Sequence, residues 1–266
     1  MKRKNRRRLI IVALFFPLFV SAQENKFPDI GKHFSKKEKA TFERALEYQT
    51  GFYTQILPDR IVDFSAIKIS VVTDAKELKN HEILPMFNKS SGYYSSTKRE
   101  LVIFKTEKFE HAFMKTMFHE LSHALQHLYS GEQFNRNPPW LNEGLAVYLS
   151  EMTYHSKKNV HKKSDYLIAR VKTLIELRDL DLVSFVNWEH PKFTKTSFSQ
   201  DGYGYAVGYC MTLFLMNKNE KNAYALFRSL IEENKPTTEI FDNYYEGGFS
   251  QFEKDFFDYM GKIKLR

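Results

Sequence analysis

The chain of 266 residues has 42% apolar and 27% charged side chains, which is typical of a soluble globular protein. This composition excludes a collagen-like, disordered or multi-spanning membrane chain. The single cysteine, Cys210, excludes a disulfide framework and any site that needs several thiolates. The net charge of +8 comes largely from residues 1–8, which hold six of the forty basic side chains; forty less six leaves 34 against 32 acidic ones. A nucleic-acid partner is therefore not predicted.

Residues 1–22 have the three-part layout of a secretory signal peptide. Basic side chains in residues 2–8 precede an apolar run from Leu9 to Val20, and a small-residue cleavage site ends at Ala22. A retained anchor helix is the alternative, but the twelve residues of the run rise only about 18 Å, against a hydrocarbon core of about 30 Å. We therefore expect cleavage after Ala22, no stable membrane span afterwards, and export to the periplasm or the cell exterior.

Residues 23–108 predict a helix followed by a small sheet. A capping-box pair predicts the start of the helix, alternation of apolar and polar side chains predicts a strand, and two apolar segments around a polar turn predict a hairpin. These segments are, in order, Ser35 to about Leu57, residues 67–71, and residues 92–94 with residues 101–104.

Residues 109–266 predict helices almost throughout. The predicted helices are 109–129, 139–152, 165–177, 203–216, 220–233 and 251–260, the last capped by Ser250 and Glu253. Strands first and helices afterwards predict an α+β fold, with a small N-terminal mixed sheet over one helix and a helical C-terminal part. Because no repeat or linker divides residues 23–266, we expect them to form one unit.

The strongest chemical signal is the sequence His-Glu-Leu-Ser-His at residues 119–123, within a predicted helix. Four residues along a helix turn through about 400°, so the imidazoles of His119 and His123 point the same way, one turn apart. Two ring nitrogens can then bind one zinc ion at roughly 2.0–2.1 Å. Glu120 follows the first ligand, where its carboxylate can take a proton from water. A plain amphipathic surface helix would show the same periodicity, so the motif alone does not decide.

A second segment, residues 139–148, offers a third ligand. Glu143 is its only acid, and a carboxylate among apolar residues is costly unless a cation or hydrogen-bond donors compensate. The alternative is a glutamate stabilised by the dipole at a helix start. Gly144 costs about 1 kcal/mol of helix propensity relative to alanine, which a close approach to the helix of the two histidines would explain. His127 lies about 12 Å along that helix from the first histidine, too far to bind the same ion.

The motif at residues 119–123, followed by Trp-Leu-Asn-Glu-Gly-Leu-Ala at residues 140–146, resembles the gluzincin zinc metallopeptidases, specifically the peptidase-MA-like families. The resemblance covers about residues 90–153. It implies a zincin-like fold with one zinc ion per chain, held by the two histidines and Glu143. The predicted hairpin resembles the edge strand along which gluzincins bind an extended substrate. Thermolysin-like members have an aspartate four residues after the glutamate ligand to orient a histidine, and Val147 stands here instead.

The resemblance and the spacing together imply hydrolysis of peptide bonds in a peptide or protein substrate. Glu120 is the expected general base towards water, and then the proton donor to the leaving amine. A tyrosine-rich segment, residues 203–209, resembles a helix of similar families more loosely. From it Tyr205 is the predicted donor to the developing oxyanion, with Tyr203 and Tyr209 as alternatives. For each tyrosine, packing in a helical core is the competing interpretation.

Two other interpretations of the motifs stay open. One is a non-catalytic envelope binding protein on the same fold, with a structural or vestigial metal site, although the intact Glu120 argues against a vestigial one. The other is a peptidase that acts only on its own cell-envelope partner. The basic residues 157–163 predict a solvated loop rather than a patch for anionic polymers or lipids. The sequence contains no phosphate-binding or serine-hydrolase motif.

Overall fold

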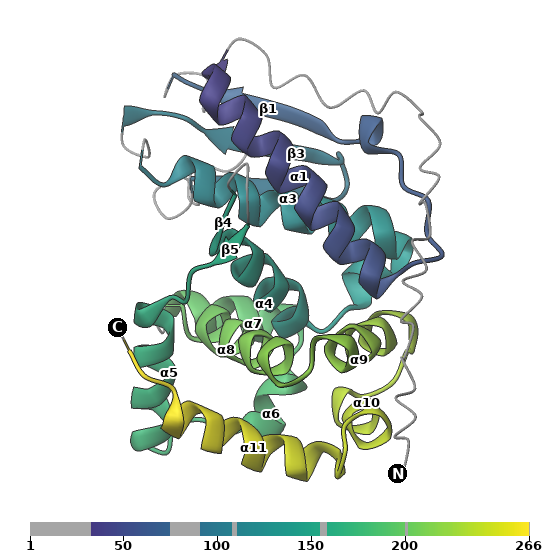
Figure 1. The fold of residues 1–266 in the computed structure, drawn as a ribbon, viewed down its shortest axis with the longest axis vertical. Helices are drawn as coiled ribbons and strands as arrows, with labels where there is room; N and C mark the ends of the chain where they lie inside the picture. The colour runs from purple at the N-terminus through teal and green to yellow at the C-terminus, as the bar shows by residue number, and fades with distance from the viewer. Residues whose placement is uncertain (1–32, 75–90, 108–110, 155–158, 200–201, 266) are drawn as a thin grey trace, which may run out of the picture.

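The computed structural model describes residues 33–74, 91–107, 111–154, 159–199 and 202–265 (Figure 1). The predicted signal peptide lies outside these ranges. Within them, no helix combines the length and the apolar character needed to cross a membrane.

Helix α1 (Lys36–Ile56) begins where the sequence predicts. The backbone N–H of Ser35 donates to the Glu38 carboxylate over 2.6 Å, and the N–H of Glu38 donates to Ser35 Oγ over 3.3 Å. Both halves of the predicted capping box are therefore present. The buried side of the helix, which includes Phe42 and Tyr53, packs on α3.

The N-terminal half contains a three-stranded mixed sheet in the order β1-β3-β2. β3 (Glu100–Phe104) pairs in parallel with β1 (Lys68–Val72) and antiparallel with β2 (Gly92–Ser95). Every residue of β3 is buried, as its central position requires. The antiparallel register aligns Tyr94 with Leu101, so the predicted hairpin is confirmed, and β2 lies at one edge of the described sheet.

Two helices carry the motif residues and connect the two halves of the molecule (Figure 1). Helix α3 (Phe113–Ser130) packs against the sheet and against α1. A 3-10 helix (Gly131–Arg136) follows it and leads into α4 (Pro139–Ser150). The short connection turns the chain back, so that α3 and α4 pack against each other.

Helices make up almost all of the C-terminal half, which lies below α4 in Figure 1. They are α5 (Asp165–Glu176), α6 (Leu182–Val186), α7 (His190–Ser199), α8 (Tyr203–Lys218), α9 (Glu220–Glu232), α10 (Thr237–Tyr244) and α11 (Gly248–Lys262). The predicted α+β class is confirmed, because a small mixed sheet packs on α3 and the rest of the described chain is mostly helical. The sequence did not predict α6, α7 or α10, of which α6 and α10 span only five and eight residues.

The predicted helix 139–152 is two residues too long. α4 ends at Ser150 because β4 (Met152–Thr153) pairs antiparallel with β5 (Val160–His161), a two-stranded element that the sequence did not predict. The last helix also starts earlier than predicted. Its N-terminal cap is Gly247, which has a φ of +84°, so Ser250 and Glu253 lie inside the helix and do not cap it.

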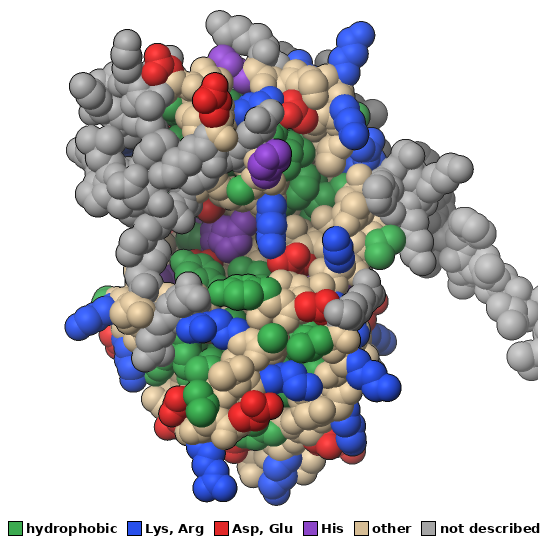
Figure 2. All heavy atoms as spheres, turned by 90° about the vertical axis from the view of Figure 1, so that its left-hand side faces the viewer, with side chains coloured by type: hydrophobic (Ala, Val, Ile, Leu, Met, Phe, Trp, Pro, Cys, Tyr) green, Lys and Arg blue, Asp and Glu red, His purple; other side chains and the backbone are tan. Residues whose placement is uncertain are grey.

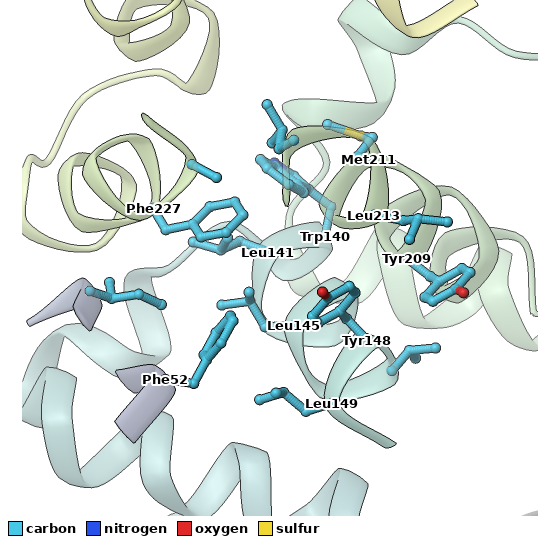
Figure 3. Packing of buried hydrophobic residues seen from close by; sticks show 14 of the residues in the cluster. Phe52, Trp140, Leu141, Leu145, Tyr148, Leu149, Tyr209, Met211, Leu213 and Phe227 are labelled. Carbon is cyan, nitrogen blue, oxygen red and sulfur yellow. The ribbon is translucent and has the colours of Figure 1, made fainter. Parts of the chain in front are cut away.

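Helix α4 lies in the middle of the main hydrophobic core, which spans both halves of the molecule. Figure 3 shows Trp140 and Leu141 of α4 close to Phe227 of α9, and Leu145 of α4 close to Phe52 of α1. Each of these side chains is almost fully buried. The helix that carries Glu143 is therefore held by packing on several sides.

Gly144 allows α4 to approach α8, and the prediction that it faces the His119 helix is wrong. A Cβ at Gly144 would lie 2.5 Å from the carbonyl oxygen of Gly208, and a Cβ at Gly208 would lie 2.7 Å from that of Trp140. The two glycines thus bring the backbones of α4 and α8 into contact. This contact fixes Glu143 relative to the first turn of α8.

Candidate metal centre

His119, His123 and Glu143 bring three ligand atoms together. The two Nε2 atoms are 3.1 Å apart, and Glu143 Oε2 lies 3.2 Å from that of His119 and 3.4 Å from that of His123. Three atoms bound at about 2.0 Å to one tetrahedral ion would be about 3.3 Å apart. The triangle has the size of one face of such a coordination tetrahedron, and the three residues form a group that could hold a metal ion.

Helix geometry explains how the three side chains converge. His119 and His123 lie one turn apart on the cleft side of α3, as predicted, and Glu143 is in the early part of α4, which faces them. In the part of the chain that the structure describes, this is the one group of three or more histidine, cysteine, aspartate or glutamate side chains with such spacing. The predicted convergence of these residues is confirmed.

The charges of the three groups stabilise one another. Burial alone would raise the pKa of the Glu143 carboxyl group, but the two imidazoles outweigh burial and hold that pKa below its usual range. Burial would lower the pKa of His123, but Glu143 and Glu120 raise it above the usual value. The carboxylate is thus kept ionised and ready to bind a cation.

At position 147 a valine stands in place of the aspartate that would orient a histidine ligand. Val147 lies one turn after Glu143, and its side chain lines the cavity beside the metal centre. The buried Nδ1 of His123 has no hydrogen-bond partner among the described residues. Among the described residues, therefore, no side chain replaces the missing aspartate at His123.

Hydrogen bonds between buried polar groups connect α3 to α1 and to α4. The Tyr53 hydroxyl of α1 lies 2.6 Å from Ser122 Oγ, and Gln126 Nε2 donates to the backbone oxygen of Asn142 over 3.0 Å. Gln126 Nε2 also approaches Ser122 Oγ at 3.3 Å. These bonds tie the helix of the two histidines to α1 and to α4 next to Glu143. The sequence analysis missed this network because its members are far apart in the chain.

Glu120 lies inside the cavity beside the metal centre, with only 8% of its surface exposed. Burial raises the pKa of its carboxyl group, although His119 and His123 act in the opposite direction. The backbone N–H of Tyr94 in β2 donates a hydrogen bond to the carboxylate. Strand β2 therefore helps to fix the carboxylate that the sequence predicts to be the general base.

Of the three tyrosines named from the sequence, Tyr205 alone lines the cavity. Its ring centroid lies 6.4 Å from that of His119, and the charge of Glu143, together with burial, raises its pKa. Tyr203 stacks on Trp188 at 5.4 Å, and the Tyr209 hydroxyl accepts a hydrogen bond from the N–H of Ser164 over 3.0 Å. These two tyrosines contact other parts of the protein and are not among the residues that line the cavity.

The cavity beside the metal centre has a volume of about 590 Å³, within the usual range for ligand sites. Its walls come from β2, α3, α4, the start of α5 and the first turn of α8. Figure 2 shows histidine side chains in a hollow between the sheet-containing half above and the helical half below. The C-terminal half thus contributes to the lining through α5 and α8.

Two further histidines are not part of the metal group. His127 Nδ1 is 2.8 Å from the Tyr94 hydroxyl, and its ring packs on Phe134, so it does not join the metal group. His190, at the start of α7, was not singled out from the sequence. Burial and the charge of His123 lower its pKa, and the charge of Glu143 acts in the opposite direction. No local motif marks it.

No protein-family model and no curated protein matches this chain.

Proposed function

We propose that this protein is an exported zinc metallopeptidase that hydrolyses peptide bonds in peptides or proteins. The observation that carries the proposal is the triangle of two imidazole nitrogens and one carboxylate oxygen, with sides of 3.1, 3.2 and 3.4 Å, at the wall of a cavity that also contains Glu120. A structural zinc site would instead have four protein ligands, whereas the group among the described residues has three.

The donor set suits zinc. Two histidines and one glutamate are the ligands of catalytic zinc in several hydrolases, where the fourth position stays open. The chemistry that zinc supplies in such sites is Lewis acidity, which acidifies water and polarises a carbonyl group. His119, His123 and Glu143 would hold the ion.

Glu120 and Tyr205 would supply the proton transfer and the oxyanion hydrogen bond. Glu120 would accept a proton from the attacking water while the water oxygen bonds to the carbonyl carbon. When the C–N bond breaks, Glu120 would return the proton to the leaving nitrogen. The hydroxyl of Tyr205 would donate a hydrogen bond to the oxyanion that develops on the former carbonyl oxygen. The position of both side chains in one cavity supports these roles.

The lining of this cavity supports a peptide substrate. Gly92, Tyr93 and Tyr94 of β2 line it together with Glu120. The strand that the sequence predicts to bind an extended substrate is therefore beside the proposed catalytic groups. This arrangement favours a peptide over a compact small molecule.

Glu120→Gln is the direct test. We expect the variant to bind one zinc ion per chain, as the wild type does, and to lose peptidase activity by about a thousandfold, because the proton acceptor is gone. Metal analysis and cleavage of a diverse peptide library measure the two properties. Glu47→Gln is a matched control, since Glu47 is exposed on α1. Full activity in Glu120→Gln would contradict the assigned role, and inactivity of zinc-loaded wild type would favour a non-catalytic binding protein.

A further inference from the structure

Phe134, in the 3-10 helix that connects α3 to α4, contacts the ring of His123. The two ring centroids are 6.4 Å apart, and the ring planes meet at 72°, which is an edge-to-face arrangement. Aromatic rings attract one another in this arrangement at such distances. A residue outside the motifs therefore packs against one of the three side chains of the metal group.

Two further rings keep the ring of Phe134 in place. It packs on His127 of α3 at 5.1 Å between ring centroids, and it meets Tyr94 of β2 edge to face at 6.4 Å. The Tyr94 hydroxyl lies 2.8 Å from His127 Nδ1, so these two neighbours are also connected to each other. We call Tyr94, His127 and Phe134 the aromatic cluster. Because its members come from β2, α3 and the connection after α3, three separate elements hold it.

The backbone of Phe134 is connected to α4. Its carbonyl oxygen accepts a hydrogen bond from Asn142 Nδ2 over 3.3 Å, and Asn142 directly precedes Glu143. Asn142 is only 3% exposed, so water has little access to its side chain. Phe134 thus contacts His123 through its ring, and the residue before Glu143 through its backbone.

The location of Phe134 separates a role in metal binding from a role in substrate binding. Phe134 is not among the residues that line the cavity beside the metal centre, so a substrate in that cavity would not touch it. A change at Phe134 would therefore reach the site through His123. A ring that packing has already oriented loses less conformational freedom when it binds an ion, and this strengthens binding.

We propose that Phe134 is a positioning residue for the metal ion, because it fixes the orientation of the His123 ring relative to Glu143. The inference rests on the proposed zinc site of the peptidase and adds a residue that neither motif contains. Leucine at position 134 would keep an apolar side chain but would remove the ring that faces His123. Zinc binding should then weaken roughly tenfold, at the lower end of the loss typical for groups that orient a ligand.

Zinc affinity of three variants, measured by competition with a chelator, tests the proposal. Phe134→Leu should bind zinc about tenfold more weakly than the wild type, whereas Phe134→Tyr keeps the ring and should stay within about twofold. Phe249→Leu is the matched control, because Phe249 is a buried residue of α11 that packs on Phe241 and Phe252. It should lower the free energy of unfolding, measured in urea on the metal-free protein, and leave zinc affinity unchanged. Unchanged affinity in folded Phe134→Leu, or an equal loss in Phe249→Leu, would overturn the proposal.

Cobalt(II) in place of zinc gives a second readout that requires no turnover. The visible absorption of bound cobalt depends on the geometry of its ligands, so Phe134→Leu should change the spectrum, whereas Phe134→Tyr and Phe249→Leu should not. A wild-type spectrum in Phe134→Leu would overturn the role of Phe134. If the wild type binds zinc but cleaves no peptide, and Phe134→Leu still weakens zinc binding, the peptidase function is wrong and the role of Phe134 stands. A wild type that binds neither ion would overturn both.

Discussion

The two sides of helix α3 use buried polar groups in different ways. On the side that faces α1, the Ser122 hydroxyl and the Gln126 amide nitrogen are bonded to neighbouring protein groups. On the cleft side, the ligand atoms of His119, His123 and Glu143 converge on one another. A buried polar group by itself therefore does not mark a functional site, whereas several ligand atoms that converge on one point do.

This comparison predicts that changes on the cleft side affect metal binding, whereas changes on the rear side affect stability. The largest effect is expected for Glu143→Ala. Loss of a direct ligand should weaken zinc binding by more than about a hundredfold, which is the loss typical of partners that only support a ligand. Competition with a chelator of known affinity measures the change. Unchanged zinc affinity in a folded variant would remove Glu143 from the metal group.

Gly144→Ala tests whether the contact between α4 and α8 supports both the stability of the fold and the position of Glu143. The added methyl group would clash with the backbone of Gly208, so we expect unfolding to become easier by about 2 kcal/mol, and zinc binding to weaken as Glu143 moves. Gly51→Ala is the matched control, because no atom lies within 4 Å of a Cβ there. That change should stabilise α1 by about 0.5–1 kcal/mol. Urea unfolding should therefore show changes in the free energy of unfolding of opposite sign for the two variants. Changes of the same sign would contradict the close contact of α4 and α8.

The pH dependence of the free energy of unfolding tests the packing of His161 against Tyr148 of α4. The His161 ring stacks on Tyr148 at 4.3 Å and lies 6.0 Å from Tyr209, and burial, with the charge of Lys163, lowers its pKa from 6.5 to about 4. Between these two values the unfolded chain binds a proton that the folded chain does not, so the free energy of unfolding falls as the pH falls.

For the metal-free protein, this loss between pH 7 and pH 4.5 should be on the order of 2 kcal/mol. It should be absent from the His161→Phe variant, which keeps an aromatic ring but cannot titrate. Urea unfolding at the two pH values measures the difference. The same pH dependence in both proteins would show that His161 takes up its proton in the folded state.

Tyr53→Phe is expected to have the smallest effect. It removes the hydroxyl that bonds to Ser122 on the rear of α3 and should lower the free energy of unfolding by about 1 kcal/mol. Because the cleft side is untouched, zinc affinity should stay within about twofold. A large loss of zinc affinity together with a small loss of stability would show that the rear network orients the ligands.

The metal group could be predicted from the sequence because its geometry is mostly local. A single helix fixes His119 and His123 relative to each other, and Glu143 is conspicuous as the one acid in an apolar segment. The capping box of α1 and the hairpin of β2 and β3 were predictable for the same reason, since each depends on residues close together in the chain.

Features that depend on how helices pack together could not be predicted. Gly144 signals a close approach, but it does not say to which helix. α8 is buried on nearly all sides, so periodicity does not reveal that Tyr205 faces the cavity while Tyr209 faces Ser164. The ion pair between Lys115 and Glu151 likewise could not be predicted, because it depends on how α3 and α4 pack.

The most direct measurement of the shared metal site is an anomalous difference map, recorded at the zinc absorption edge from crystals grown with zinc. We expect one strong peak per chain, about 2.0–2.1 Å from the Nε2 atoms of His119 and His123 and from a carboxylate oxygen of Glu143. A strong peak elsewhere, with no density among these three side chains, would contradict the site on which the proposed peptidase function depends.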